Sequence, residues 1–112
     1  MEKHVKMSML YDFYGQMLTE RQRKYIDLYY CHDLSLGEIS EQYGVSRQSV
    51  YDILKRSEQV LCKFEEKLGL VAKYLEQREC LDRAISLLKG GSKSEVQRAR
   101  EILSELIQAE ES

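Results

Sequence analysis

Apolar side chains recur along the chain at the three- and four-residue spacing of α-helices. The first such stretch runs over Lys3–Tyr14 and is followed by Gly15, which favours a helix end. Its apolar positions are Val5, Met9, Leu10 and Phe13. No run alternates apolar and polar residues as strands do, and the chain has no proline. The pattern therefore predicts an all-α fold.

Two capping boxes indicate where the next two helices begin. Thr19 is followed three residues later by Gln22, and Ser35 by Glu38, so that each side chain can bond an unpaired backbone N–H group. The first of these helices is expected to end near His32. Its apolar positions are Tyr25, Ile26, Leu28, Tyr29 and Tyr30, and those of the second helix are Leu36, Ile39 and Tyr43.

Gly44 indicates a tight turn, because glycine adopts positive φ without a steric penalty. After it, Val45 is expected to fill the core and Ser46 to cap a further helix. Two short helices that cross steeply need apolar residues on both sides of such a turn, and a small residue such as Ser40 where the backbones approach. The segment Leu18–Arg56 is therefore predicted to be a helix-turn-helix.

The helix after this turn is predicted to be long. Its apolar stripe consists of Val50, Ile53, Leu54, Val60, Leu61, Phe64 and Leu68. Because the stripe is longer than a compact head needs, we expect it to join two copies of the chain in a homodimer. The alternative is that the C-terminal helices fold back and cover the stripe within one chain.

Helical spacing continues beyond Gly69 and stops at a turn marked by two glycines and a serine, after which a last helix starts at Ser94. Its acidic end is expected to fray. The short connection predicts an antiparallel pair. We therefore expect residues 1–69 to form the head with its N-terminal helix, and residues 70–112 a helical hairpin. This hairpin is either part of the same domain or a dimerisation appendage.

Three motifs in the head point to a known fold and cover about one third of the chain. They are Leu18-Thr19-Glu20-Arg21-Gln22, Leu34-Ser35-Leu36 with Glu38-Ile39, and Gly44-Val45-Ser46-Arg47 with Val50. On these motifs the head resembles region four of bacterial sigma factors. The expected fold is thus a sigma region four-like or winged-helix-like head with a long recognition helix, followed by two C-terminal helices.

Further features extend the likeness to most of the chain. They are the opening Met7–Tyr14, the Tyr29-Tyr30 pair, the seven residues Gly44–Val50, and an acidic helical tail behind the head. In this combination the chain resembles the YlxM family of small proteins from Gram-positive bacteria. The resemblance implies a regulator that gene neighbourhood links to the signal recognition particle pathway, with components of that particle as partners.

If the head binds DNA, the start of the second helix of its helix-turn-helix lies in the major groove. The side chains then expected at the bases are Arg47, Gln48, Tyr51 and Asp52, with Ser46 and Ser49 near phosphates. Arg47 can pair with guanine and Gln48 with adenine. The candidates for backbone phosphate contacts are Lys55, Arg56 and Lys63 on the same helix, and Arg21, Arg23 and Lys24 on the preceding one.

The charge balance argues against a tight DNA binder. The net charge is −2, with 8 basic and 8 acidic residues over residues 1–57 and 9 against 11 over the remainder. Autonomous DNA binding usually rests on many Lys and Arg contacts to phosphates. In addition, Ser49 and Tyr51 stand where sigma factors often carry arginine, and Asp52 adds a negative charge.

Two functions therefore remain open. The first is a regulatory DNA-binding protein that takes part in the signal recognition particle pathway. The alternative is a protein or ribonucleoprotein interaction module of the targeting machinery with little DNA affinity, in which Arg47 and Gln48 are simply solvated. The tyrosines at positions 25, 29, 30 and 43 are expected in the core rather than in a stacking platform for single-stranded RNA.

Other classes of function are not supported by the sequence. No apolar run is long enough to span a bilayer, and Met1–Tyr11 lacks the apolar core of a signal peptide, so we expect a cytoplasmic protein. The three cysteines, Cys31, Cys62 and Cys80, are expected to be buried reduced thiols. Without a nucleophile and base, a phosphate loop or metal-ligand spacing, we expect no enzymatic activity, no cofactor and no metal.

Overall fold

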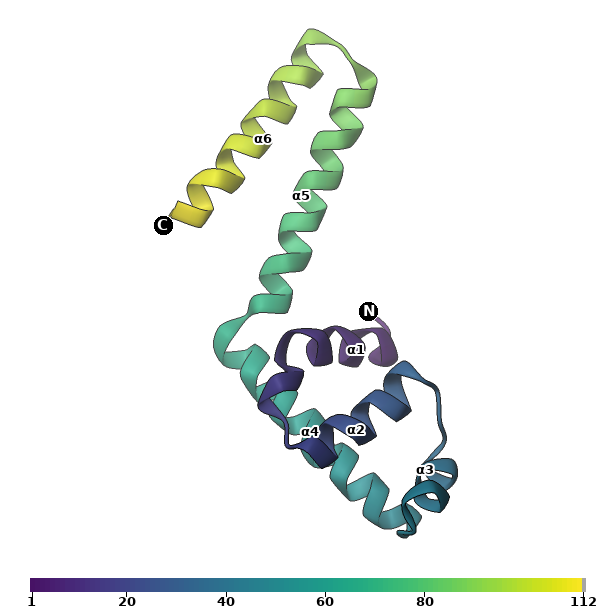
Figure 1. Cartoon of the computed structure of the whole chain (residues 1–112). Coiled ribbons are helices and arrows are strands. Elements are labelled where there is room, and N and C mark those ends of the chain that lie inside the picture. Colours follow the sequence, from purple (N-terminus) through teal and green to yellow (C-terminus); the bar gives the residue numbers. More distant parts are fainter. Residues whose placement is uncertain (112) are drawn as a thin grey trace. The chain divides into compact units, whose positions relative to one another are not determined.

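The computed structural model describes residues 1–111, and over these residues the chain is all-α, as predicted (Figure 1). Its helices are α1 (Lys3–Tyr14), α2 (Glu20–Ile26), α3 (Leu36–Tyr43), α4 (Arg47–Leu68), α5 (Leu70–Gly90) and α6 (Lys93–Glu111). The described residues contain no strand, so the head has no wing. In the same range no helix combines the length and the apolar character needed to cross a membrane.

The chain divides into two compact units, Met1–Val71 and Ala72 onwards. The first unit contains the head, in which α1, α2 and α3 each pack against α4. Its core consists of Met7, Leu10, Tyr14, Leu18, Tyr25, Ile26, Tyr30, Ile39, Val50, Leu54, Leu61 and Val71. Helix α4 is therefore the element around which the other three helices of this unit are organised.

Helix α1 has the predicted bounds, and its buried face agrees with the prediction in part. Leu10 is buried and Met9 packs against the core, as predicted, but Met7 and Tyr14 are also buried. The predicted positions Val5 and Phe13 are instead exposed. Both sets fit a helical period, so the sequence spacing alone did not fix which face meets α4.

The second predicted helix changes its geometry midway. After Ile26 the backbone widens into a π turn over Asp27–Cys31, and the amide of His32 bonds the carbonyl of Asp27 at 3.1 Å. The wider turn matches the five-residue interval between Tyr25 and Tyr30, both of which are buried. The end near His32 agrees with the prediction, whereas the π turn was not foreseen.

Both predicted capping boxes are present, and they fix the starts of α2 and α3. At the second, the Ser35 hydroxyl oxygen accepts from the amide of Glu38 at 3.1 Å, and the Glu38 carboxylate accepts from the amide of Ser35 at 3.1 Å. Gly44 ends α3 with φ of 64°, a left-handed conformation that glycine adopts readily. The α3–turn–α4 unit is thus the predicted helix-turn-helix.

The long apolar stripe of α4 is covered within the chain, which removes the argument that it joins two copies. Val50, Leu54 and Leu61 are buried, and Ile53, Val60 and Phe64 pack against the same core. The N-terminal helix α1 supplies the cover that the sequence analysis had missed, because it lies against α4 over this stretch (Figure 1). Leu68 is the member of the stripe that stays exposed.

Two hydrogen-bonded side chains close the first unit at the junction of α4 and α5. The Tyr14 hydroxyl donates to Glu65 Oε1 at 2.6 Å and accepts from the amide of Leu70 at 3.1 Å. Glu65 Oε1 also accepts from the amide of Val71 at 3.0 Å. Burial, followed by the bond to the Glu65 carboxylate, raises the pKa of Tyr14.

Some side chains lie closer to solvent than the sequence predicts. Tyr43 is 38% exposed, although its ring lies 5.2 Å from that of Tyr25. Cys31 is exposed, and Cys62 and Cys80 are half-buried, so the prediction of buried thiols is wrong for Cys31 and too strong for the others. All three are free cysteines, in agreement with the expectation of reduced thiols.

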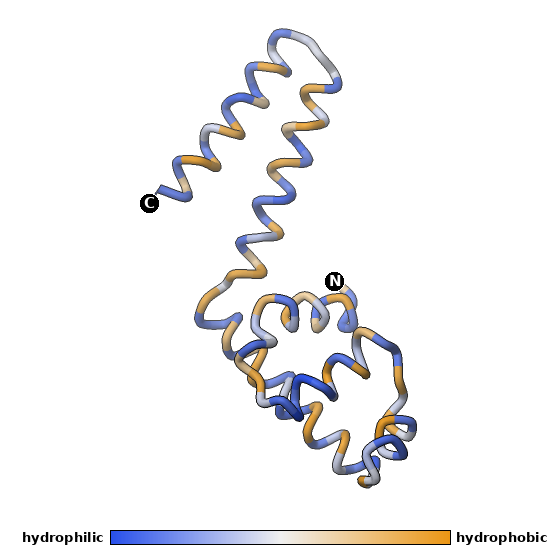
Figure 2. Tube along the Cα trace, viewed as in Figure 1, coloured by the Kyte–Doolittle hydropathy of each residue, from blue (hydrophilic) through white to orange (hydrophobic). Residues whose placement is uncertain are grey.

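The second unit is an antiparallel hairpin of α5 and α6, joined near Gly90 and Gly91 (Figure 1). Its buried side chains are Ala84, Ala99 and Ile102, with Cys80 and Leu87 packed against them. This core is small for two helices of about five turns each, and apolar side chains alternate with polar ones around both helices (Figure 2). Much of the apolar surface of the hairpin is therefore left uncovered.

The capping box at α3 can be tested through the stability of the head. Substitution Ser35→Ala is expected to lower the free energy of unfolding by about 1 kcal/mol, because the amide of Glu38 loses its acceptor. Urea unfolding followed by circular dichroism measures this change. The exposed truncation Gln59→Ala is the control and is expected to change stability by less than about 0.5 kcal/mol.

The same box also makes stability depend on pH. The backbone amide and the hydroxyl of Ser35 lower the pKa of Glu38, so its stabilising contribution is complete above the ordinary glutamate pKa of about 4.3. It is lost as the pH falls through the lowered value. The difference in stability between the natural chain and Glu38→Gln should therefore shrink on acidification. A difference that grows in acid would contradict the assignment.

Candidate nucleic-acid interface

The candidate interface is built on the first turns of α4. Ser46 caps this helix, and its hydroxyl oxygen accepts from the amide of Ser49 at 3.0 Å. The helix has no acidic residue in its first turn, so its positive dipole end is not neutralised locally. The start of α4 is thus capped, and its positive end favours negative charge nearby.

The exposed side of α4 presents two rows of side chains at four-residue spacing. One row consists of Arg47, Tyr51 and Lys55, and the other of Gln48, Asp52 and Arg56. The buried positions Val50 and Leu54 lie on the opposite side of the helix. These six members of the predicted DNA-binding set therefore lie on one side of α4, as the helical spacing predicts.

The side chain of Arg47 is exposed, and its guanidinium lies near the first turn of α3. A Cβ atom on Gly37 would stand 3.0 Å from one guanidinium nitrogen of Arg47 and 3.1 Å from Nε. Glycine at this position therefore makes room for the guanidinium over the first turn of α3. In the same row, Lys55 Nζ lies 5.5 Å from the centre of the Tyr51 ring, which is within range of a cation–π contact.

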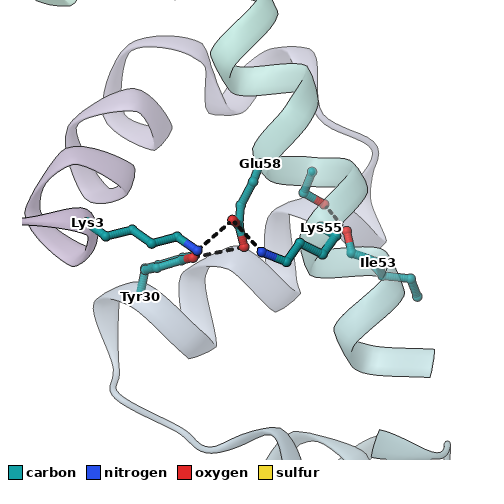
Figure 3. A network of polar contacts seen from close by, with 6 residues as sticks. Lys3, Tyr30, Ile53, Lys55 and Glu58 are labelled. Atoms are coloured by element: carbon teal, nitrogen blue, oxygen red, sulfur yellow. Dashed lines mark hydrogen bonds and ion pairs between the residues drawn. The ribbon is translucent and has the colours of Figure 1, made fainter. Parts of the chain in front are cut away.

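Lys55 also belongs to a charged network around Glu58 (Figure 3). Glu58 is only 9% exposed, and its carboxylate lies 3.2 Å from Lys3 Nζ and 3.9 Å from Lys55 Nζ. The Tyr30 hydroxyl donates to Glu58 Oε2 at 2.9 Å. The network therefore ties the start of α1 and the π turn to α4.

The ionisation of this network follows from its contacts. The hydrogen bond to Glu58, together with its negative charge, raises the pKa of Lys3. Burial, followed by the bond to Glu58, raises the pKa of Tyr30. Lys3 is therefore protonated and Tyr30 neutral at physiological pH.

Two side chains of the second row, Gln48 and Asp52, are hydrogen-bonded to each other. Gln48 Nε2 donates to Asp52 Oδ1 at 2.9 Å, one helical turn further along. This bond holds the Gln48 amide along the helix surface and satisfies one of the Asp52 oxygens. Asp52 therefore both orients Gln48 and places a negative charge in the middle of the candidate surface.

The predicted phosphate contacts on α2 lie in two kinds of surroundings. The guanidinium carbon of Arg21 lies 5.7 Å from the centre of the Tyr25 ring, and Lys24 Nζ lies 3.6 Å from Glu20. Arg23 is exposed, as is Lys63 near the far end of α4. Over residues 1–111, no ion pair within 4 Å involves Arg23, Arg47, Arg56 or Lys63.

Sequence reasoning missed the residues that support this surface from beneath. Lys55 and Glu58 stand three residues apart, which is a helical pairing interval and could have indicated their contact. Lys3 and Tyr30 come from distant parts of the chain, and nothing in their local sequence marks them. Among residues 1–111 no three His, Cys, Asp or Glu side chains cluster in a way that could hold a metal ion.

The Glu58 network can be tested by removing its hydroxyl donor. Tyr30→Phe is expected to lower the free energy of unfolding by about 1 to 2 kcal/mol, because a buried carboxylate loses a partner. Urea denaturation provides the measurement. Tyr51→Phe is the matched control, since its ring is half-exposed, and it should change stability by less than about 0.5 kcal/mol. Equal effects of the two variants would count against the network.

The contact between Arg47 and Gly37 gives a second prediction. Gly37→Ala is expected to raise the free energy of unfolding by about 0.5 kcal/mol, because alanine favours the helix and the flexible tip of Arg47 can move aside. Thermal unfolding measures the change. A loss of stability would show that Arg47 is fixed in place and cannot yield to the added methyl group.

Comparison with known proteins agrees with this architecture. Residues 1–105 match the UPF0122 family, described as "Putative helix-turn-helix protein, YlxM / p13 like". A UPF0122 protein of Desulforamulus reducens is 46% identical over 112 residues, which cover 96% of each chain. YlxM of Bacillus subtilis is 46% identical over 95 residues, covering 85% of this chain and 86% of its own. The resemblance to the YlxM family is confirmed, and the chain belongs to the UPF0122 family of YlxM-like helix-turn-helix proteins.

Proposed function

We propose that this protein is a regulator that binds duplex DNA through the N-terminal half of α4. The observation that carries the proposal is the placement of Arg47, Gln48 and Tyr51, which are exposed at the start of the second helix of a helix-turn-helix. In this motif those positions are the ones that reach base edges in the major groove. The function is binding and not catalysis.

On DNA, each row of α4 has a separate role. Arg47 leaves its resting position over Gly37 and donates two hydrogen bonds to a guanine edge. Gln48 exchanges its bond with Asp52 for an adenine edge. Arg56 and Lys63, further along the exposed side of the helix, are suited to backbone phosphates, as is Arg23 on α2.

Asp52 and Glu58 keep the affinity of a single head moderate. Asp52 repels phosphates directly, and Glu58 holds one phosphate candidate, Lys55, at 3.9 Å. Such a surface discriminates by base contacts more than it gains from general attraction to the phosphate backbone. We therefore expect weak binding to random DNA and a marked preference for particular sequences.

Fluorescence anisotropy with a labelled pool of random-sequence duplexes, followed by selection of the tightest binders, tests the proposal. Binding to the selected duplex is expected to weaken as salt rises from about 50 to 200 mM, because phosphate contacts release counterions. Arg47→Ala should cost about 1 to 3 kcal/mol on that duplex. If no duplex binds at low salt, or if Arg47→Ala does not change the affinity, the proposed DNA binding is contradicted.

Asp52→Asn is the variant to compare with Arg47→Ala, because it is expected to change DNA affinity in the opposite direction. It removes the repelling charge while keeping an oxygen that can accept from Gln48, so affinity for duplex DNA should rise several-fold. Lys89→Ala, which changes a charge in the second unit, is the control and should leave the affinity unchanged. A decrease in affinity with Asp52→Asn would instead assign Asp52 a direct base contact.

A second candidate function is supported by the charges that the structure pairs internally. Lys55 is engaged with Glu58 and Lys24 with Glu20, which reduces the positive charge offered to DNA. A module that contacts protein or RNA components of the protein-targeting machinery would need no such charge. An apolar protein interface changes little with salt, so the salt titration distinguishes this function from DNA binding.

A further inference from the structure

The carboxylate of Glu58 is shared by lysines from two different helices (Figure 3). Glu58 Oε1 lies 3.2 Å from Lys3 Nζ on α1 and 3.9 Å from Lys55 Nζ on α4. The other oxygen, Oε2, accepts the hydrogen bond of the Tyr30 hydroxyl at 2.9 Å. The two ammonium groups therefore compete for one oxygen atom, and Lys3 is the closer of the two.

Lys55 belongs both to this network and to the candidate interface. Its Nζ lies 5.5 Å from the centre of the Tyr51 ring, in the row that begins with Arg47. Both of these side chains line a hollow of about 120 Å³ with Lys3 and Glu58, so the network reaches the surface beside this row. The Lys55 side chain is 44% exposed, and its distance from the carboxylate is at the outer limit of an ion pair. Its charge is therefore still accessible from solvent.

Glu58 needs a cation because its side chain is largely shielded from water. The side chain of Glu58 is 12% exposed, against 58% for that of Lys3. A buried carboxylate that loses an opposite charge is strongly unfavourable, so removal of one lysine draws the other closer. The hydrogen bond and the negative charge of Glu58 raise the pKa of Lys3, which keeps this ammonium protonated beside the carboxylate. With Lys3 in place, Lys55 is not needed as the main partner of Glu58.

We propose that Lys3 is a positioning residue for DNA binding: by pairing with Glu58, it leaves the charge of Lys55 free for a DNA phosphate. The inference rests on the proposed function, because it gives Lys55 a phosphate contact. Without Lys3, Lys55 becomes the cation nearest to Glu58 and is drawn away from the DNA. Helix α1, which lies outside the helix-turn-helix, thus raises the affinity of α4 for DNA without touching the duplex.

The state of Lys55 can be measured without DNA, by limited acetylation of the full chain followed by mass spectrometry. An amine held closer to a carboxylate is more often protonated and therefore reacts more slowly. Lys3→Met should slow the acetylation of Lys55 by about 2- to 5-fold. Lys63 is the internal reference, because it lies on the same helix and has no ion pair within 4 Å in the described part of the chain. An unchanged rate at Lys55 relative to Lys63 would overturn the inference.

Titrations of the selected duplex measure the consequence for DNA binding. Lys3→Met should weaken binding by about 2- to 5-fold and lower the salt slope by about 1, as the loss of one phosphate contact does. A merely structural role of Lys3 would leave the salt slope unchanged. Lys6→Met is the matched control, since Lys6 is an exposed lysine of α1 with no ion pair within 4 Å among residues 1–111, and it should leave both quantities nearly unchanged. Lys3→Arg keeps the charge and should bind as the natural chain does, and circular dichroism verifies that each variant is folded.

Double variants separate this indirect role from a direct contact between Lys3 and DNA. If Lys3 acts through Lys55, Lys3→Met should add little to the effect of Lys55→Met. It should also add little to Glu58→Gln, which removes the charge that Lys3 compensates but keeps an acceptor for Tyr30. The same loss in every background would refute the positioning role and assign Lys3 a phosphate contact of its own. If no duplex binds the natural chain, the proposed function itself fails, whereas normal binding and salt slope in Lys3→Met refute the positioning role alone.

Discussion

The packing of α1, α2 and α3 against α4 is the interaction on which the rest of the head depends. Val50, Leu54 and Leu61 of α4 are buried among side chains from all three helices, and Glu58 on the same helix binds Lys3 and Tyr30. The proposed recognition helix, α4, is thus also the central core helix. Its inner side is committed to the fold, so the proposed binding surface is confined to its outer rows.

This dual role explains the polar groups beneath the interface. A buried carboxylate is unfavourable unless it is paired and hydrogen-bonded, and Glu58 obtains both kinds of partner. Its contacts with Lys3 and Tyr30 link α4 to the start of α1 and to the π turn, in addition to the apolar packing. Lys55, drawn toward Glu58, shows that the same network also determines how much positive charge reaches the outer surface.

Features set by neighbouring residues could be predicted from the sequence. The helix caps and the turn depend on hydrogen bonds to residues three or four positions away in the sequence. The structure places all of them as the sequence indicates, at Thr19, Ser35, Ser46 and Gly44. The buried side of α1 could be predicted only in part: Leu10 is buried as expected, but Val5 and Tyr14 both fit a helical period and only contact with α4 selects between them.

The same distinction holds for the candidate site. The surface shared by Arg47, Gln48 and Asp52 follows from helical spacing, whereas the network of Lys3, Tyr30 and Glu58 joins segments separated by more than twenty residues. The covering of the α4 stripe by α1 is a further long-range fact, and it removes the argument for self-association through α4.

The junction at Tyr14 and Glu65 determines where the head ends. Gly69 looks like a natural boundary, because it closes α4 in a left-handed conformation. Yet Tyr14 and Glu65 bond the amides of Leu70 and Val71, and Val71 is part of the core. A chain shortened at Gly69 would lose the amide donors of Leu70 and Val71 to Tyr14 and Glu65, together with the buried side chain of Val71. The smallest segment able to fold as the head therefore extends through Val71, so the first residues of α5 belong to the fold that precedes them.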